Sequence, residues 1–177
     1  MLAAYQQPSI ALRYFNACGA LPEAGLGPDH RHNVHLLTRI MLAALGKVPE
    51  VWVHGDDYPT PYGTCIRDYI HVDDLASAHV LAVRSLLHEP RATAISLGIG
   101  IGRGHSVLEV LRAADEVVGK EIVRRVGPRR PGDPARIVAD ASRARQELGW
   151  EPRWLDMRSI VTSAWDWHRQ HPDGYRA

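Results

Sequence analysis

The sequence predicts an α/β domain, and three features of its 177 residues carry that prediction. Short runs rich in β-branched residues alternate with longer segments in which apolar residues recur every three or four positions, as strands alternate with helices in α/β proteins. The composition, with 45% hydrophobic and 23% charged residues, is that of an ordinary soluble globular protein. The length suffices for one domain with a substantial core.

The charge balance and the cysteine count exclude several function classes. Twenty-one Lys and Arg against twenty Asp and Glu give a net charge of +1, too little to attract a polyanion, so no nucleic-acid partner is expected. Cys18 and Cys65 form neither a disulfide framework nor a metal motif, which fits a cytoplasmic protein. The start does not resemble a signal peptide, and the longest apolar run, around 40–45, is too short to span a membrane.

Turn and capping signals divide the first half of the sequence into three strands and one helix. A loop over 16–33, rich in Gly, Pro, Asp and His, and a second polar loop over 56–64 separate these elements. The strands are predicted at 9–15, 51–54 and 67–72, and the helix at 35–46.

The second half contains clearer helix starts. Asp73 is placed to cap a helix that runs to about Leu87, and Ser106 and Glu109 have the spacing of a capping box that starts a helix ending near Val118. No strand with a Gly-rich turn comes first, as a doubly wound domain requires, so we expect the sequence to begin in the middle of a fold. The remaining predictions are strands at 94–97 and 122–126, a tight loop at 128–134, and helices at 140–149 and 155–168.

Four glycines within 98–104 suggest a phosphate-binding loop, but their spacing argues against it. The dinucleotide fingerprint needs glycines at offsets zero, two and five. Counting from Gly98 the third position is Arg103, and counting from Gly100 it is His105. A plain connection between a strand and a helix is therefore the preferred interpretation.

The sequence contains no complete metal or catalytic constellation. His30, His32 and His35 lie near Asp29, yet their spacing does not place two ligands on one helical face, so a loop is favoured over a metal site. No tyrosine is followed by lysine four residues later, and neither a serine nucleophile elbow nor an HExxH motif is present. We therefore assign no catalytic residue.

The arginines are the most informative polar residues, and they leave two interpretations open. Arg67 opens a predicted strand beside Asp68, and an Arg–Asp step is most often a surface ion pair. The segment 129–133 (RRPGD) is a rigid turn that presents two guanidinium groups and a carboxylate. The alternative is that these two arginine sites clamp a diphosphate while Asp133 accepts hydrogen bonds from ribose hydroxyls.

Four segments together resemble one family. The most specific is Asp57–Ala76 (DYPTPYGTCIRDYIHVDDLA), and the others are Leu12–Asn16, His35–Leu37 and Arg129–Ala135. In this order they resemble the C-terminal half of the UDP-glucose 4-epimerase family of extended short-chain dehydrogenases/reductases. The resemblance implies part of an NAD(P)-binding Rossmann-like fold: a single fragment, 1–177, that holds mostly the substrate-binding domain and the last strands and helices of the Rossmann domain.

The resemblance also implies ten site residues. Arg67 and Arg130 match the two arginines that hold the diphosphate, and Asp133 matches a ribose contact. Tyr14 and Phe15 match residues at the nicotinamide end of the cofactor. The full set expected to bind the UDP-sugar is Asn16, His35, Leu37, Val53 (on the strand beside the uracil), Arg67, Tyr69, Arg130 and Asp133.

The family interconverts UDP-glucose and UDP-galactose, in galactose metabolism, with tightly bound NAD and a Tyr-x-x-x-Lys pair. Because that pair and the NAD-binding half are missing here, the resemblance implies a truncated epimerase that is inactive alone and does not bind NAD tightly. A homodimer is expected of the intact family member. Two alternatives stay open: a stand-alone nucleotide-sugar binding module, and one half of a split enzyme. Thr38 and Ile137 depart from the family pattern, which expects a proline and an aromatic residue there.

Overall fold

The computed structural model describes residues 8–29, 35–88 and 94–175, and it confirms the mixed α/β architecture. His30 and His32 lie outside the described residues. The helices are η1 (Pro22–Ala24, 3-10), α2 (Leu36–Ala44), α3 (Val72–His88), α4 (Val107–Val118), α5 (Ser142–Leu148) and α6 (Met157–Gln170). The strands are β1 (Ser9–Arg13), β2 (Asn16–Cys18), β3 (Val51–His54), β4 (Ile66–His71), β5 (Ala94–Gly98), β6 (Gly104–Ser106), β7 (Arg124–Gly127) and β8 (Arg136–Ile137). Among these described elements, no helix is long and apolar enough to cross a membrane.

The described strands form three small sheets. β1 pairs with β5 in parallel, and β3 pairs with β7 in parallel. In the third sheet β4 pairs in parallel with β2 and β8 and antiparallel with β6. Both β6 and β8 pair with the first two residues of β4, so they lie on opposite edges of it. Parallel pairs predominate because helices and long loops carry the chain back between strands.

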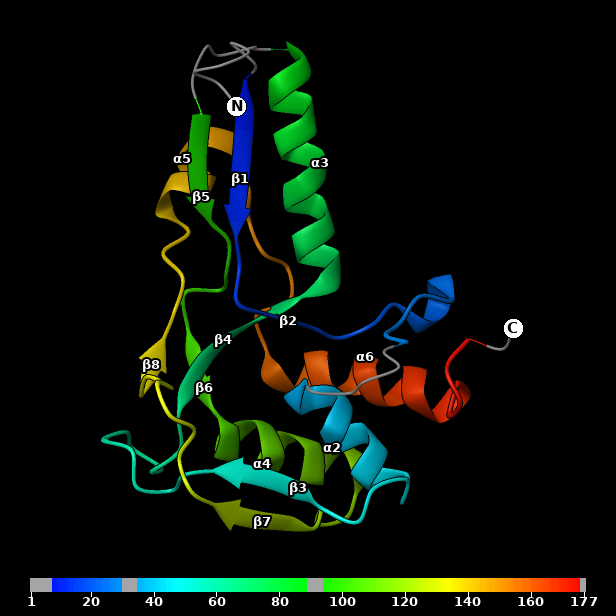
Figure 1. Cartoon of the computed structure of the whole chain (residues 1–177). Coiled ribbons are helices and arrows are strands. Elements are labelled where there is room, and N and C mark those ends of the chain that lie inside the picture. Colours follow the sequence, from blue (N-terminus) through cyan, green and yellow to red (C-terminus); the bar gives the residue numbers. More distant parts are fainter. Residues whose placement is uncertain (1–7, 30–34, 89–93, 176–177) are drawn as a thin grey trace.

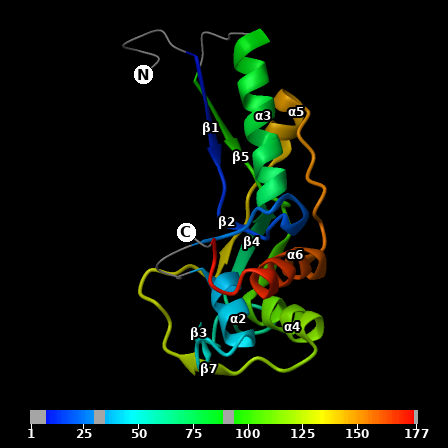
Figure 2. The same ribbon diagram turned by 90° about the vertical axis from the view of Figure 1, so that its right-hand side faces the viewer.

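β4 links the two ends of the molecule (Figures 1 and 2). β1, β5, α3 and α5 lie at one end, and α2, α4, α6 and the β3–β7 pair lie at the other, with β4 running between them. The hydrophobic core is divided in the same way. Tyr69 belongs to the cluster formed with α2, α4 and α6, whereas its neighbour Ile70 belongs to the cluster around Trp150. Alternate side chains of one buried strand thus stabilise both ends.

Among the described elements, three short strands and one helix start differ from the sequence predictions. The predicted loop over 16–33 begins with β2, the glycine-rich connection ends in β6, and the segment after the Arg129–Pro134 turn contains β8. Each of these strands is held by pairing with β4 rather than by a local pattern. Asp73 does not cap α3, because β4 passes directly into that helix at Val72 and Asp73 lies in its first turn.

The capping box predicted for α4 is confirmed. The Ser106 hydroxyl accepts a hydrogen bond from the Glu109 backbone N–H at 3.2 Å, and the Glu109 carboxylate accepts from the Ser106 N–H at 2.8 Å. Gly119 ends the helix with a left-handed φ of 79°. This start places Val107, the first residue of α4, at the wall of the cavity described below.

The glycine-rich loop before β6 is a structural connection. The Asp68 carboxylate accepts hydrogen bonds from the backbone N–H groups of Ile101 and Gly102, each at 3.1 Å. A Cβ atom at Gly100 would lie 2.5 Å from the same carboxylate, so only glycine fits there. Since a protein carboxylate already occupies these amides, the loop does not present them to a phosphate.

Candidate functional site

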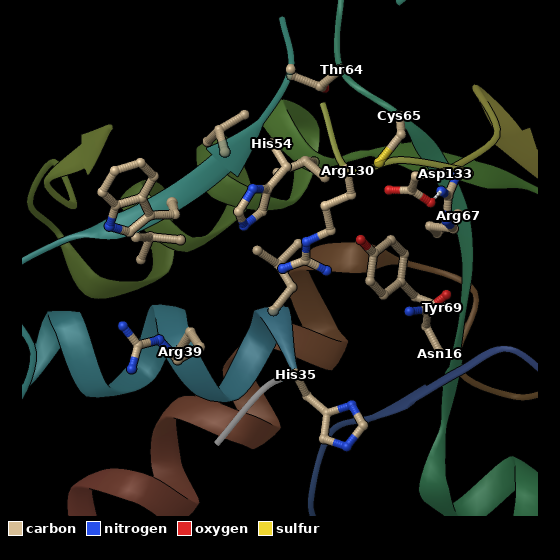
Figure 3. A pocket seen from close by; sticks show the side chains of 16 residues that line it. Asn16, His35, Arg39, His54, Thr64, Cys65, Arg67, Tyr69, Arg130 and Asp133 are labelled. Carbon is tan, nitrogen blue, oxygen red and sulfur yellow. Dashed lines mark hydrogen bonds and ion pairs between the residues drawn. The ribbon is translucent and has the colours of Figure 1, made fainter. Parts of the chain in front are cut away.

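A cavity of about 520 Å³ lies between α2, β3 and β4 (Figure 3). Segments far apart in the sequence meet around it, from β2 to the turn that follows β7. Its polar lining residues are Asn16, His35, Arg39, His54, Thr64, Cys65, Arg67, Tyr69, Arg130 and Asp133. Seven of the eight residues expected to bind a nucleotide-sugar are brought together here, namely Asn16, His35, Val53, Arg67, Tyr69, Arg130 and Asp133.

Arg67 is fixed in the cavity wall by two acceptors. One guanidinium nitrogen donates to the Ile66 carbonyl oxygen at 2.7 Å, and the other donates to the Asp133 carboxylate. The Arg67 side chain is 11% exposed and that of Asp133 is 26% exposed, so the pair is shielded from water yet open on the cavity side. The unused N–H groups of Arg67 are thereby presented to the cavity in a fixed orientation.

The neighbouring Asp68 does not pair with Arg67, which removes the interpretation of this step as a surface ion pair. Successive side chains on β4 point to opposite faces. Arg67 and Tyr69 face the cavity, while Asp68 is buried on the other side and also accepts from the Ala139 N–H at 3.1 Å. The geometry therefore separates a cavity-lining cation from a structural carboxylate.

The two arginines of the Arg129–Pro134 turn have different positions. The Arg129 guanidinium donates to Asp57 at 2.7 Å and lies over the Tyr58 ring, 4.3 Å from its centroid. Arg130 instead lines the cavity. Among the described residues, no carboxylate lies within 4 Å of the Arg130 guanidinium. Arg130 is thus available to a ligand in the cavity, whereas Arg129 holds the loop that contains Asp57 and Tyr58.

His54 lines the cavity close to these charges. Its pKa is lowered mainly because the ring is partly buried, and secondly because of the positive charge of Arg130. Burial also raises the pKa of the Cys65 thiol and of the Tyr69 hydroxyl. At neutral pH the histidine, thiol and phenol are therefore uncharged, and Arg67, Arg130 and Arg39 supply the positive charge that faces the cavity.

A second cavity of about 570 Å³ adjoins the first. Asn16, His35 and Tyr69 line both of them. Leu37 lines only the second cavity, so the structure does not bring it to the other predicted nucleotide-sugar residues. Tyr14 and Phe15, the two residues expected near nicotinamide, also line the second cavity and are 43% and 48% exposed.

Sequence reasoning missed several lining residues of the first cavity. Thr64 and Cys65 directly precede β4, and Arg39 lies one turn into α2. The i, i+4 spacing from His35 to Arg39 was the available signal, because it places both side chains on one face of the helix. Within the described part of the chain, no group of three or more His, Cys, Asp or Glu side chains could hold a metal ion.

The chain is similar in sequence and fold to known UDP-glucose 4-epimerases. That of Lacticaseibacillus casei is 44% identical over 172 residues, covering 97% of this chain and 51% of that protein. The Bifidobacterium longum enzyme, solved in complex with NAD+ and UDP, superposes with a TM-score of 0.89 at 39% identity, over 98% of this chain and 51% of that one. The Stenotrophomonas maltophila enzyme, solved with bound NAD and formylated UDP-arabinopyranose, gives 0.88 at 43% identity, over 96% of this chain and 50% of that one.

The chain spans about half the length of the curated relatives it matches, and the match is to their C-terminal half. Residues 1–98 match the model of a family described as the NAD dependent epimerase/dehydratase family. Because this match takes in more than half of the 177 residues, the chain belongs to the NAD dependent epimerase/dehydratase family.

Proposed function

We propose that this chain forms the UDP-sugar-binding half of a UDP-glucose 4-epimerase. The observation that carries the proposal is the convergence of Arg67, Arg130, Asp133 and Asn16 on one cavity. Relatives at 44% identity are UDP-glucose 4-epimerases, and one solved relative holds UDP. The two free thiols are in keeping with a cytoplasmic location.

The diphosphate is proposed to bind between Arg67 and Arg130. A guanidinium group is planar, permanently charged and suited to bidentate hydrogen bonds with phosphate oxygens. Arg67 is oriented beforehand by Ile66 and Asp133, which lowers the entropic cost of binding. Asp133 keeps lone pairs that the Arg67 hydrogen bond does not use, and these accept from ribose hydroxyls.

The nucleobase is proposed to lie along β3. The backbone of β3 bonds to β7 through Val51 and Gly55, whose N–H groups donate to the carbonyl oxygens of Val123 and Gly127, each at 2.9 Å. Because alternate residues of a parallel strand bond to the same neighbour, the N–H and C=O groups of Trp52 and His54 point away from β7. They provide both donors and acceptors for the edge of a base.

The sugar and the nicotinamide end of NAD are proposed to meet where the two cavities adjoin. Asn16 lines both cavities, and Tyr14 and Phe15 give the second one an aromatic wall. Of the described residues, only this aromatic wall suits NAD, at its nicotinamide end. The glycine-rich loop does not offer its amides to the phosphates of NAD, because those of Ile101 and Gly102 are bonded to Asp68. NAD supplies hydride transfer when bound, and this chain's own part is to orient the sugar against it.

We infer that the reaction needs residues beyond this sequence, which has no Tyr-x-x-x-Lys pair. An exposed apolar stripe on α3 favours a missing half that covers it, carried by the same protein or by a second polypeptide. It argues against a binding module that functions alone. Val80, Val83 and Leu87 recur there at helical spacing and are 50%, 54% and 73% exposed. Among the described strands, β1 also pairs on one edge only. A homodimer of the completed enzyme is part of this proposal.

The test of the binding site is the Arg67→Leu variant. It should weaken UDP binding by about 1.5–3 kcal/mol, the range for a hydrogen bond to a charged group, measured by isothermal titration calorimetry. Arg124→Leu is the matched control, because Arg124 is also partly buried and paired with an aspartate, Asp115, but does not line the cavity. Equal UDP affinity in the Arg67 variant and the unaltered chain would refute the assignment of Arg67.

The second test concerns the cofactor. Since the described residues offer NAD an aromatic wall and no anion cradle, equilibrium dialysis of the chain with NAD should give no tight binding, with UDP as the positive control. Tight and stoichiometric retention of NAD would contradict the proposal that this chain binds the UDP-sugar and that NAD binding needs the missing half.

A further inference from the structure

Arg39 is a cation that faces the cavity and forms no ion pair with another described residue. Its side chain is half-buried on α2 and lines the cavity. In the described part of the chain, no carboxylate lies within 4 Å of its guanidinium, whereas Arg67, which lines the same cavity, is paired with Asp133. A partly desolvated guanidinium presents five donors that need acceptors. The proposed diphosphate site does not account for it.

Arg39 lies at the end of the cavity away from the diphosphate site. The Arg39 N–H donates to the His35 carbonyl at 3.0 Å, so Arg39 follows His35 by one helical turn, a rise of about 5–6 Å. Figure 3 shows Arg39 apart from Arg67 and Asp133, with Arg130 between them. Trp52 lines the same cavity on β3. A nucleotide with its diphosphate at Arg67 and Arg130 and its base along β3, as proposed above, extends that base toward Arg39.

The atom of a pyrimidine nucleotide that lies farthest from its phosphates is the substituent on C4, opposite the bond to ribose. In uracil this substituent is a carbonyl oxygen, a hydrogen-bond acceptor. In cytosine it is an amino group, a donor. The arginine side chain has hydrogen-bond donors only. It therefore bonds to the carbonyl oxygen of uracil, whereas opposite the amino group of cytosine two donors would face each other.

We propose that Arg39 is a specificity-determining residue that selects uracil over cytosine by donating hydrogen bonds to the C4 carbonyl oxygen. This inference rests on the proposed UDP-sugar function and names a determinant of its base selectivity. Discrimination of this kind is large, because the wrong partner leaves buried polar groups unpaired.

The experiment is calorimetric titration of the 177-residue chain with UDP and with CDP. The unaltered chain should bind UDP roughly tenfold or more tightly than CDP. Arg39→Leu should lose most of the UDP affinity and leave CDP binding nearly unchanged, so that the preference collapses. Arg39→Gln, whose amide both donates and accepts, should bind the two nucleotides about equally and guards against a folding defect in the leucine variant.

Arg125→Leu is the control for a general effect of charge. Arg125 lies over the Trp52 ring, 5.1 Å from its centroid, but does not line the cavity. If Arg39 attracts phosphate only by its charge, its variants will weaken UDP and CDP by the same factor, which overturns the inference. UDP binding that depends on Arg67 but is equally selective without Arg39 also overturns it while sparing the proposed function. Absence of UDP binding by the unaltered chain contradicts both.

Discussion

Adjacent residues of β4 have opposite tasks, and the difference follows from strand geometry. Arg67 faces the cavity, whereas Asp68 is 1% exposed and accepts three backbone hydrogen bonds, from Ile101, Gly102 and Ala139. A carboxylate has the acceptor capacity for all three, and the negative charge strengthens each bond. Asp68 thus connects the glycine-rich loop and the segment after β8 to the back of the ligand-facing strand.

Asp68→Asn is expected to destabilise the fold by roughly 2–3 kcal/mol, because an amide NH2 would replace one acceptor oxygen and face a backbone donor. Urea unfolding followed by circular dichroism measures this. Asp166→Asn is the control, since Asp166 is in a solvent-exposed pair with Arg169 and should change stability by less than about 0.5 kcal/mol. Equal unfolding midpoints for the two variants would show that the three bonds to Asp68 contribute little.

The sequence predicted only some of the residues that line the cavity. Spacing alone indicated that Arg67, Arg130 and Asp133 could share a ligand, and the structure places them on one cavity. The resemblance added Asn16, His35, Val53 and Tyr69, and their roles toward a ligand stay predictions. Arg39 was not predicted: its spacing from His35 places both residues on one face of the helix, but the wall of the cavity that α2 forms is a tertiary property.

Elements with local signals were predictable, and elements held by partners were not. The capping box at Ser106, the helix of α2 and the loop around Gly132 follow from residues next to one another in the sequence. β2 and β8 are three and two residues long and owe their conformation to hydrogen bonds with β4. Short pairing segments of this kind have no periodicity to detect.

Ser106→Ala should lower the unfolding free energy by about 1 kcal/mol, the usual effect of losing an N-cap. The variant loses the hydroxyl that accepts from the Glu109 N–H and donates to its carboxylate at 2.8 Å. Ser96→Ala, at an exposed position of β5, is the control and should be nearly neutral. Thermal melts of both variants give the comparison, and an unshifted Ser106 variant would mean that packing alone fixes the start of α4.

At the scale of the whole molecule, four histidines among the described residues make stability depend on pH. The pKa values of His54, His71, His105 and His168 are lowered from 6.5, and burial is the largest cause for each. The unfolded chain therefore binds more protons than the folded chain in the window below pH 6.5. Stability is fully present above that pH and is lost as the pH falls through the window.

Urea unfolding at pH 7.5, 6.5 and 5.5 should accordingly give a decreasing free energy of unfolding. Carboxylates such as Glu109 and Asp140, whose pKa values are lowered from 4.5 and 3.8, titrate below this range and do not contribute. His105→Phe removes one buried titrating ring and should reduce the pH dependence. A free energy that is constant from pH 7.5 to 5.5 would exclude this role of the histidines.

The burial of β4 on both faces fixes its length. Insertion or deletion of a single residue near its start would exchange the two faces, so that Asp68 and Ile70 would point into the cavity and Arg67 and Tyr69 into the interior. A change of two residues would preserve the faces but displace the pairing with β2, β6 and β8. Substitutions can therefore accumulate in this strand one at a time, whereas changes in its length cannot.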